Sequence, residues 1–368
     1  MKFTIFALAL VFLSIKVYAV DKKYEFSDLK YFINKAPGVA VLVVKNGKTI
    51  LKNGYGLANI EKKIKITEET IFESGSVAKM FTSAAIIKLH EKGMVDLKKP
   101  AKYYLSSDFD FLSPKITVEN LIFHTSGIPD YLNDKSLNLN KKVNSDIFID
   151  NDFVFKYLKS KRVNNKDINA IFNYSNTNYV LLSMIIENIS KKSYKNYMKE
   201  DIFDDVKMDS FIHEAGRLVD DRESISYSEW PNFKILKNKT NYITTGDFGI
   251  QISINDFEKW IQFIQNNNYI WNKYQTHGYV LQNGKVMQID YGYGMRFGKI
   301  DGIDCLFHRG YINGASNIFV YNKELDTFVV ILSNTSSVFT DNLAGYILRE
   351  IEKSDTQQQN DKQVNINF

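Results

Sequence analysis

Runs of apolar residues typical of buried strands lie near both ends of this 368-residue chain, with mostly helical patterns between them. Residues 39–44 form a continuous apolar run, and Asn46-Gly47 followed by residues 49–51 is a tight-turn hairpin signal. Strand patterns return late in the chain, at residues 291–295, 318–321 and 327–332, before a closing helix over 338–352. We therefore expect one sheet completed by segments that are far apart in the sequence.

The middle of the chain is predicted to be helical. Apolar periodicity indicates helices over residues 76–92, 180–191 and 254–264, separated by loops rich in Asn and Asp. Residues 354–368 are rich in Gln, Asn and Lys and have no periodic apolar face, so we expect a disordered tail there. A hydrophobic content of 44% is ample for a buried core.

The N-terminus has the pattern of a secretory signal peptide. Met1-Lys2 precedes an apolar stretch that ends at Ile15, and small residues flank Tyr18, as a leader peptidase prefers. An uncleaved membrane anchor is the alternative, but the apolar run is short for a membrane span and Lys16 interrupts its end. We expect cleavage of residues 1–19 and a periplasmic or secreted protein without a stable membrane anchor.

Composition argues against several classes of protein. Cys305 is the single cysteine, so no intramolecular disulfide can form and stability must come from core packing. The formal net charge of +5 is too weak to indicate nucleic-acid binding. The histidines show no metal-ligand spacing, and the glycine patterns of α/β-hydrolases, dinucleotide sites and P-loops are missing. We expect neither a metal nor a cofactor.

Ser76-Val77-Ala78-Lys79 is the first candidate for chemistry. Residues three apart share one face of a helix, so the Lys79 amine can lie beside the Ser76 hydroxyl and take its proton. A second match, Ser27-Asp28-Leu29-Lys30, lies in a polar stretch, whereas Ser76 opens a strongly apolar helix. Burial near a helix N-terminus favours loss of a lysine proton. Taken alone, the pair fits a surface Ser and Lys at a helix start equally well.

Tyr174-Ser175-Asn176 supplies a phenol and an amide ahead of another apolar helix, and both groups could assist a proton shuttle. The bare pattern is weak, and a tyrosine that only caps a helix start is the structural alternative. Three other sites match it: Tyr131-Leu132-Asn133, Tyr194-Lys195-Asn196 and Tyr311-Ile312-Asn313. His308-Arg309-Gly310 combines a titratable ring with a glycine that lets the backbone approach a ligand, although a lone histidine is more often structural.

These motifs, in this order, resemble the serine β-lactamase-like and penicillin-binding hydrolases, in the branch of class C β-lactamases and D-alanyl-D-alanine carboxypeptidases. The resemblance spans nearly all of the mature chain. It rests on Ser76-x-x-Lys79, Tyr174-x-Asn176, His308-x-Gly310, residues 116–131 (similar to the family's "LLxHTSGLPDY" segment), Gly246-Asp247-Phe248-Gly249 leading to Ser253 and Asp256, and residues 291–294.

The resemblance implies an α/β (α+β) fold of the β-lactamase/transpeptidase type. An antiparallel sheet built from both chain ends and flanked by helices would face a mainly helical domain, with the active site between them. One hydrolase domain would span residues 20–353. Its α/β part would comprise about 20–75 and 265–353, and its helical part about 76–264.

The resemblance also implies roles for the candidate residues. Ser76 would be acylated, with Lys79 and Tyr174 as a coupled base, and which of the two takes the proton stays open. The main-chain N–H groups of Ser76 and Tyr311 would form an oxyanion hole, in which one donor is typically worth about 3–4 kcal/mol. Asn176 would bind the acyl-side amide of the substrate.

His308 and Gly310 would line the substrate site, whereas residues 124–131 would be structural. Many β-lactamases of this type have Lys-Thr-Gly in place of His308-Arg309-Gly310. Histidine is mostly neutral near its usual pKa of about 6.5, so a substrate carboxylate would be held differently. Arg309 could replace the lost charge, but alternation along a strand points it away from His308. Efficient β-lactam hydrolysis is therefore in doubt.

The expected function is that of an exported serine hydrolase that forms an acyl-enzyme on Ser76 and cleaves a small amide or ester. A D-amino-acid peptide of peptidoglycan is the first substrate hypothesis. An esterase or a class C-like β-lactamase is the alternative among enzymes. A catalytically silent binding protein of the same fold is the alternative from another class, although intact Ser76, Lys79 and Tyr174 argue against it. We expect a monomer whose partner is a small molecule or a short peptide.

Overall fold

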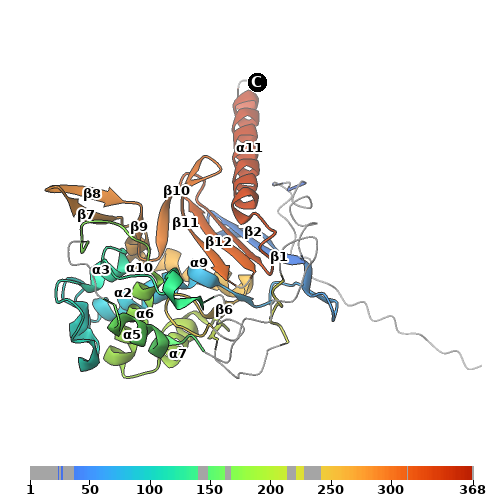
Figure 1. Ribbon diagram of the computed structural model, residues 1–368. Helices are drawn as coiled ribbons and strands as arrows, with labels where there is room; N and C mark the ends of the chain where they lie inside the picture. The colour runs from blue at the N-terminus through green and yellow to red at the C-terminus, as the bar shows by residue number, and fades with distance from the viewer. Residues whose placement is uncertain are drawn as a thin grey trace, which may run out of the picture.

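The computed structural model describes residues 24, 26–27, 37–139, 148–161, 167–213, 221–227, 242–312 and 314–366. Its largest element is an antiparallel sheet with helices on both faces (Figure 1). In spatial order the eight strands are β3 (Ile64–Lys65), β2 (Lys48–Asn59), β1 (Gly38–Lys45), β13 (Thr327–Ser333), β12 (Ala315–Asn322), β11 (Ile303–Ile312), β10 (Met295–Ile300) and β9 (Tyr291–Gly292).

The two ends of the chain meet in the middle of this sheet. Strand β1 pairs with β13, from Val39 opposite Ser333 to Lys45 opposite Thr327. Alternate residues of β1 enter two different cores: Val39 and Val41 lie in the core beneath α11 (Thr340–Ile366), and Ala40 and Leu42 lie in the larger core shared with the other helices. Burial on both faces explains the continuous apolar run. The prediction of an α/β fold with an antiparallel sheet from both chain ends is confirmed.

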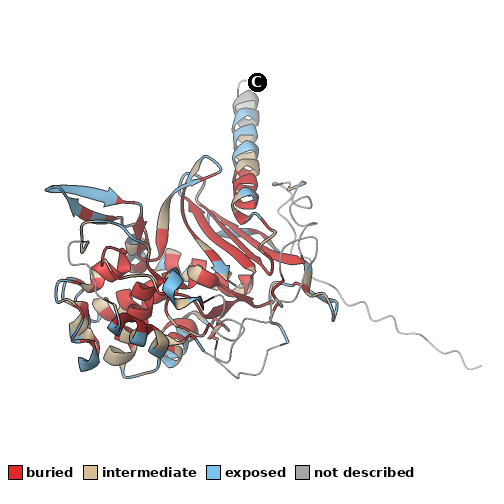
Figure 2. Cartoon of the chain, in the orientation of Figure 1, coloured by how far each residue is buried: buried red, intermediate tan, exposed pale blue. Residues whose placement is uncertain are grey.

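On the face of the sheet opposite α11, the helices pack around one buried helix. The 3₁₀ turn η1 (Gly75–Val77) leads into α2 (Ala78–Glu91), which packs against α6 (Asn176–Ser190) and α10 (Asn268–Tyr274). Figure 2 shows that most of α2 and α6 is buried. Around them lie η2 (Ala101–Tyr104), η3 (Ser107–Phe109), α3 (Val118–Ile122), η4 (Lys135–Leu137), α5 (Asn151–Lys159), α7 (Tyr194–Tyr197), the π-helix η5 (Met198–Phe203) and α8 (Asp204–Val206).

Two smaller sheets complete the described structure. β4 (Phe72–Glu73), β6 (Ile250–Ile252) and β5 (Phe211–Ile212) form a three-stranded sheet directly before η1 and α2. β7 (Gly278–Gln282) and β8 (Lys285–Ile289) form a hairpin that projects from the body of the molecule (Figure 1).

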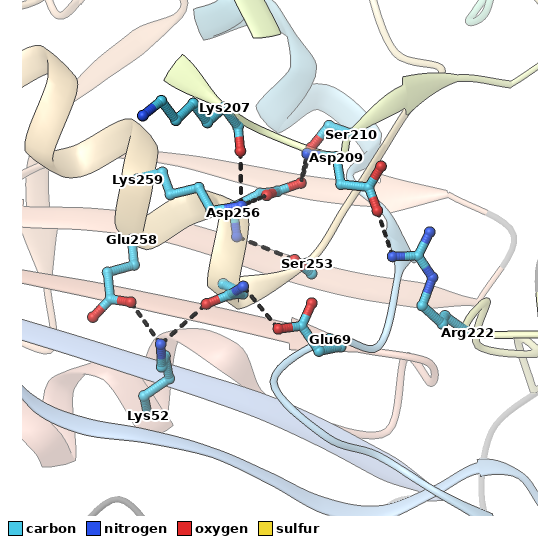
Figure 3. A network of polar contacts seen from close by, with 11 residues as sticks. Lys52, Glu69, Lys207, Asp209, Ser210, Arg222, Ser253, Asp256, Glu258 and Lys259 are labelled. Atoms are coloured by element: carbon cyan, nitrogen blue, oxygen red, sulfur yellow. Dashed lines mark hydrogen bonds and ion pairs between the residues drawn. The ribbon is translucent and has the colours of Figure 1, made fainter. Parts of the chain in front are cut away.

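Helix α9 (Ile254–Asn266) packs against β1 and β13, although the sequence assigned it to the helical part. Its N-terminus is held by a polar network (Figure 3), in which the Ser253 side chain accepts a hydrogen bond from the Asp256 main-chain N–H. The Asp256 carboxylate accepts hydrogen bonds from the Asp209 main-chain N–H (2.9 Å) and the Ser210 hydroxyl (2.8 Å). Lys52 of β2 pairs with Glu258 at 2.6 Å. These contacts tie α9 to the large sheet and to the chain just before β5.

Two sequence expectations differ from the structure. The tail predicted to be disordered over 354–368 is helical as far as Ile366, because α11 continues outward (Figure 1). No Pro or Gly interrupts this stretch, and the Asp355 carboxylate contacts the Tyr24 hydroxyl (3.0 Å) and Lys45 (2.8 Å). The strand predicted at 291–295 is broken at Gly294, where φ is +78° and an added Cβ would lie 2.6 Å from the main chain of Lys79.

Within the described residues, no helix has the length and apolar character needed to cross a bilayer. The predicted signal peptide at residues 1–19 lies outside the described residues, as does Lys30 of the second Ser-x-x-Lys match.

Trp260 of α9 tests how strongly α9 and α2 depend on each other. Its side chain is fully buried, and its ring centroid lies 4.6 Å from that of Phe81 in α2. Trp260→Ala should lower the free energy of unfolding by about 3–5 kcal/mol because it leaves a large cavity. Tyr279→Ala, on the exposed β7 hairpin, should change it by less than about 0.5 kcal/mol. Urea unfolding of both variants measures the difference, and equal losses would contradict the packing described.

Candidate active site

Ser76 and Lys79 lie at the junction of η1 and α2, one turn apart on the same face. The Lys79 side chain is fully buried, whereas Ser76 is partly exposed. The Lys79 amine donates hydrogen bonds to Ser76 Oγ (3.0 Å), Asn176 Oδ1 (2.8 Å) and the Asp247 main-chain carbonyl (2.8 Å). A protonated amine has three donors, so all three are used. The structure therefore places a solvent-shielded amine in contact with an accessible hydroxyl.

Asn176, the first residue of α6, is held at both ends of its amide. Its Oδ1 accepts from Lys79, and its Nδ2 lies 3.2–3.3 Å from the two carboxylate oxygens of Asp130. Its main-chain N–H also donates to Asp130, at 3.0 Å. Burial raises the pKa of Asp130 above its ordinary value. An amide oxygen can accept two hydrogen bonds, so Oδ1 retains a lone pair for a substrate amide, and the predicted role of Asn176 stays a prediction.

Tyr174 lies beside the Lys79 amine but contacts it through the ring. Lys79 Nζ is 5.2 Å from the Tyr174 ring centroid. Within the part of the chain that the structure describes, the Tyr174 hydroxyl forms no hydrogen bond with Ser76 or Lys79. The ring packs on His124, with centroids 4.3 Å apart. The structure thus brings Tyr174 into the site, and the choice of Lys79 or Tyr174 as base stays open.

His308 lies on β11 at the other side of Tyr174 and is buried. Its Nδ1 is 2.7 Å from the Arg309 carbonyl, which can only accept, so Nδ1 carries the proton and Nε2 accepts from the Tyr291 hydroxyl at 3.3 Å. Burial, followed by the positive charges of Lys79 and Arg296, holds the pKa of His308 well below 6.5. His308 is therefore neutral near pH 7.

Arg309 does not replace the charge that a lysine would supply at the third motif. Its guanidinium binds Asp341 of α11, with Nε 2.8–2.9 Å from the carboxylate oxygens and Nη2 at 2.6 Å. The expectation that strand alternation points Arg309 away from His308 is therefore right, and Arg309 supports the opposite face of the sheet.

Arg296 of β10 is the cation that sequence reasoning missed. Its guanidinium carbon lies 4.9 Å from the Tyr174 ring centroid and 5.5 Å from that of Tyr291. No acidic residue in the described part of the chain forms a salt bridge with it. Arg296 lies two residues after the motif at residues 291–294, and a cation so close to that motif was the signal that could have identified it.

The predicted oxyanion-hole segments lie against each other. A Cβ on Gly75 would be 2.9 Å from Tyr311 N, and a Cβ on Gly310 would be 2.1 Å from the Ser74 carbonyl oxygen. Only glycine allows β11 to approach the start of η1 this closely. The Tyr311 side chain is 60% exposed, so its predicted contribution is that of its main chain.

Other reactive groups in the described residues do not form a competing site. No cluster of three or more His, Cys, Asp or Glu side chains suited to a metal occurs there. Cys305 is buried, and burial raises the pKa of its thiol to about 11, so it is a poor nucleophile.

Comparisons with known proteins agree with this geometry. A family model described as "Beta-lactamase" matches residues 30–352. The chain belongs to the β-lactamase family. Its fold is that of the β-lactamase and penicillin-binding type.

Three relatives illustrate the relationship. "Protein flp" of Staphylococcus aureus (strain MW2) is 27% identical over 327 residues, which are 86% of this chain and 63% of that protein. The chain thus spans less than two thirds of the length of that curated relative. The octameric penicillin-binding protein homologue from Pyrococcus abyssi is 25% identical, with a TM-score of 0.71 over 87% of this chain and 74% of the other. The D-amino acid amidase from Ochrobactrum anthropi SV3 shares the fold, with 20% identity and a TM-score of 0.73 over 89% and 100%.

Within this family site, Asp130 and Asp247 are two more residues whose contacts were not foreseen. Both stand in segments that carry the resemblance, but neither was singled out. Residues 124–131 were expected to be structural, and Asp130 does act through Asn176 rather than through Ser76. Asp247 contacts Lys79 through its main chain, which no side-chain motif can reveal.

Gly310 offers a test of the close approach between β11 and η1. Gly310→Ala should push β11 away from Ser74 and displace the Tyr311 N–H, slowing acylation of Ser76 by about 100-fold, the typical effect of losing one oxyanion donor. Gly298→Ala on β10 is the control, because its Cβ would meet no described atom closer than 3.5 Å. The labelling rate with a fluorophosphonate, read by intact-protein mass, compares the two. Equal rates would exclude the predicted hole.

Proposed function

We propose that this protein is an exported serine hydrolase that forms an acyl-enzyme on Ser76 and cleaves a small amide or ester, with a short D-amino-acid peptide of the peptidoglycan type as substrate. The observation that carries the proposal is the buried Lys79 amine, 3.0 Å from the Ser76 hydroxyl. Export rests on the signal-peptide pattern at residues 1–19.

In the first step, Ser76 Oγ attacks the substrate carbonyl as its proton passes to a neutral Lys79 amine. The developing oxyanion is stabilised by the main-chain N–H groups of Ser76 and Tyr311. Collapse breaks the bond to the leaving nitrogen or oxygen, which takes the proton from Lys79. In the second step, water gives a proton to the same base and attacks the ester on Ser76, releasing the acid and restoring the Ser76 hydroxyl.

The charges around the site support a substrate with a free carboxylate. His308 is neutral, and Arg309 is occupied by Asp341. Arg296 is a half-buried cation with no described ion-pair partner, stacked on Tyr174 at the edge of the site. A guanidinium presents paired donors that fit a carboxylate. The carboxylate at the C-terminus of a short peptide is therefore the group that Arg296 suits.

The acyl-enzyme can be detected directly. Wild-type protein incubated with a fluorophosphonate or a penicillin should gain the mass of one acyl or phosphonyl group, and peptide mapping should place it on Ser76. Ser76→Ala should gain none and should lose turnover entirely. Folded wild-type protein that gains no adduct would contradict the proposal and favour a silent binding protein.

A substitution of Arg296 distinguishes substrates that carry a carboxylate from those that do not. Arg296→Gln should raise KM for a D-Ala-D-Ala peptide by about tenfold to 100-fold, the value of a hydrogen bond to a charged group, and should leave KM for a p-nitrophenyl ester without a carboxylate nearly unchanged. Arg309→Gln is the matched control, because Arg309 binds Asp341 on the other face of the sheet. A D-Ala-D-Ala peptide that is not cleaved, with efficient turnover of the ester or of a cephalosporin, would instead indicate an esterase or a β-lactamase.

A further inference from the structure

Asp247 interacts with Lys79 in two ways, through its main-chain carbonyl and through the charge of its side chain. Its main-chain carbonyl accepts a hydrogen bond from Lys79 Nζ at 2.8 Å. Its carboxyl group is fully buried in the same region, close enough for the charge of Lys79 to act on it. The neighbouring Gly246 carbonyl accepts from Thr82, one helical turn after Lys79, at 2.7 Å. The segment before β6 is therefore fastened along one face of α2.

Hydroxyl and main-chain donors surround the Asp247 carboxyl group. The Tyr131 hydroxyl donates to Oδ2 at 2.7 Å, and the Thr244 hydroxyl donates to Oδ1 at 3.0 Å. The Phe248 main-chain N–H is 3.1 Å from Oδ1. Both carboxyl oxygens therefore accept hydrogen bonds, and these hold the carboxyl group in place without a direct ion pair.

The protonation state of Asp247 is finely balanced. Burial raises its pKa to about 6, against the opposing effects of the Lys79 charge and of the hydrogen bonds from Tyr131 and Thr244. The ionisable groups that face it are Lys79 from α2, Tyr131 from the loop after α3 and Tyr194 from α7. Burial raises the pKa of both tyrosines above 10, so both stay neutral and Lys79 is the charged group that acts on Asp247.

We propose that Asp247 is a positioning residue that controls the proton on Lys79. Its carbonyl holds the amine beside Ser76, and its carboxylate, when ionised, stabilises the ammonium form of that amine. The inference rests on the proposed function, in which Lys79 must be neutral before it can take the Ser76 proton. No proton passes between the two residues in this scheme, because the coupling is the attraction between their charges.

The sign of the effect follows from the charges. Above about pH 6 the Asp247 carboxylate is ionised and favours the ammonium, which has no lone pair for the Ser76 proton. An amide in its place carries no charge, so Lys79 loses its proton at lower pH. The rising limb of Ser76 acylation against pH should therefore move toward acid in Asp247→Asn by about one pH unit, the lower end of shifts caused by an adjacent opposite charge. Between the two midpoints the variant should react up to about tenfold faster.

The test measures the rate of fluorophosphonate labelling of Ser76 from pH 5 to pH 10 in the full chain. Asp256→Asn is the matched control, since it also removes a buried carboxylate that accepts a main-chain N–H and a hydroxyl, but at the N-terminus of α9 (Figure 3). It should lower the melting temperature and leave the midpoint where it is in the wild type. A structural role of Asp247 would produce the same pattern.

Tyr131→Phe keeps the test decisive if Asp247→Asn does not fold. It removes one donor to the ionised carboxylate, so Asp247 holds its proton to higher pH. Labelling should therefore be faster than in the wild type just above about pH 6, where the wild-type carboxylate is already ionised, and the midpoint at higher pH should stay nearly unchanged. A midpoint in Asp247→Asn that stays in place or moves toward alkaline pH, or a Tyr131→Phe variant that labels no faster than the wild type just above about pH 6, overturns the inference while the proposed function stands. Wild-type protein that takes no label at any pH overturns both.

Discussion

The site depends on the burial of one amine. Lys79 is removed from water, and its donors are satisfied by groups from three separate segments: Ser76 from its own helical turn, Asn176 from α6 and the Asp247 carbonyl before β6. Burying a charged amine without such partners would cost several kcal/mol. Each of the three segments is therefore constrained to meet at this point, and the packing of α2 against α6 follows from the same requirement.

The sheet provides the rigid side of the site. Strand β11 carries His308 and Gly310 and is held between β10 and β12. The Asn317 side chain of β12 donates to the Glu73 carbonyl at 2.9 Å, which links the sheet to the strand just before η1. Because β11 and η1 approach through Gly310 and Gly75, Ser76 is set against a strand residue, Gly310, that lies more than 230 residues later in the chain. The long-range pairing of β1 with β13 serves the same end.

The contacts that could be predicted from the sequence are those that follow from helical spacing, from a tight turn or from strand alternation. The Ser76–Lys79 contact follows from helical spacing, the β1–β2 hairpin from Asn46-Gly47, and the direction of Arg309 from strand alternation. The Lys79–Asp247 contact could not be predicted, because it uses a main-chain carbonyl that any residue possesses. Arg296 was missed because its place in the site comes from stacking on Tyr174, which lies far away in the sequence. The tail was misjudged because helix continuation needs only the absence of breakers and a few anchoring contacts, such as those of Asp355.

The charged groups of the site differ in how far they lie from solvent. The carboxyl groups of Asp130 and Asp247 lie behind Asn176 and Lys79. The guanidinium of Arg296, which has no ion-pair partner among the described residues, lies toward the partly exposed Tyr174. Lys79 and Arg296 both lie against the Tyr174 ring, and their positive charges both disfavour protonation of His308. A lysine at position 308 would add a third positive charge to this confined space and would disfavour the ammonium of Lys79 and the nearness of Arg296 alike. Because the imidazole of His308 is neutral and Arg309 is bound to Asp341, Arg296 is the cation beside Tyr174 that a substrate carboxylate would meet under the proposed function.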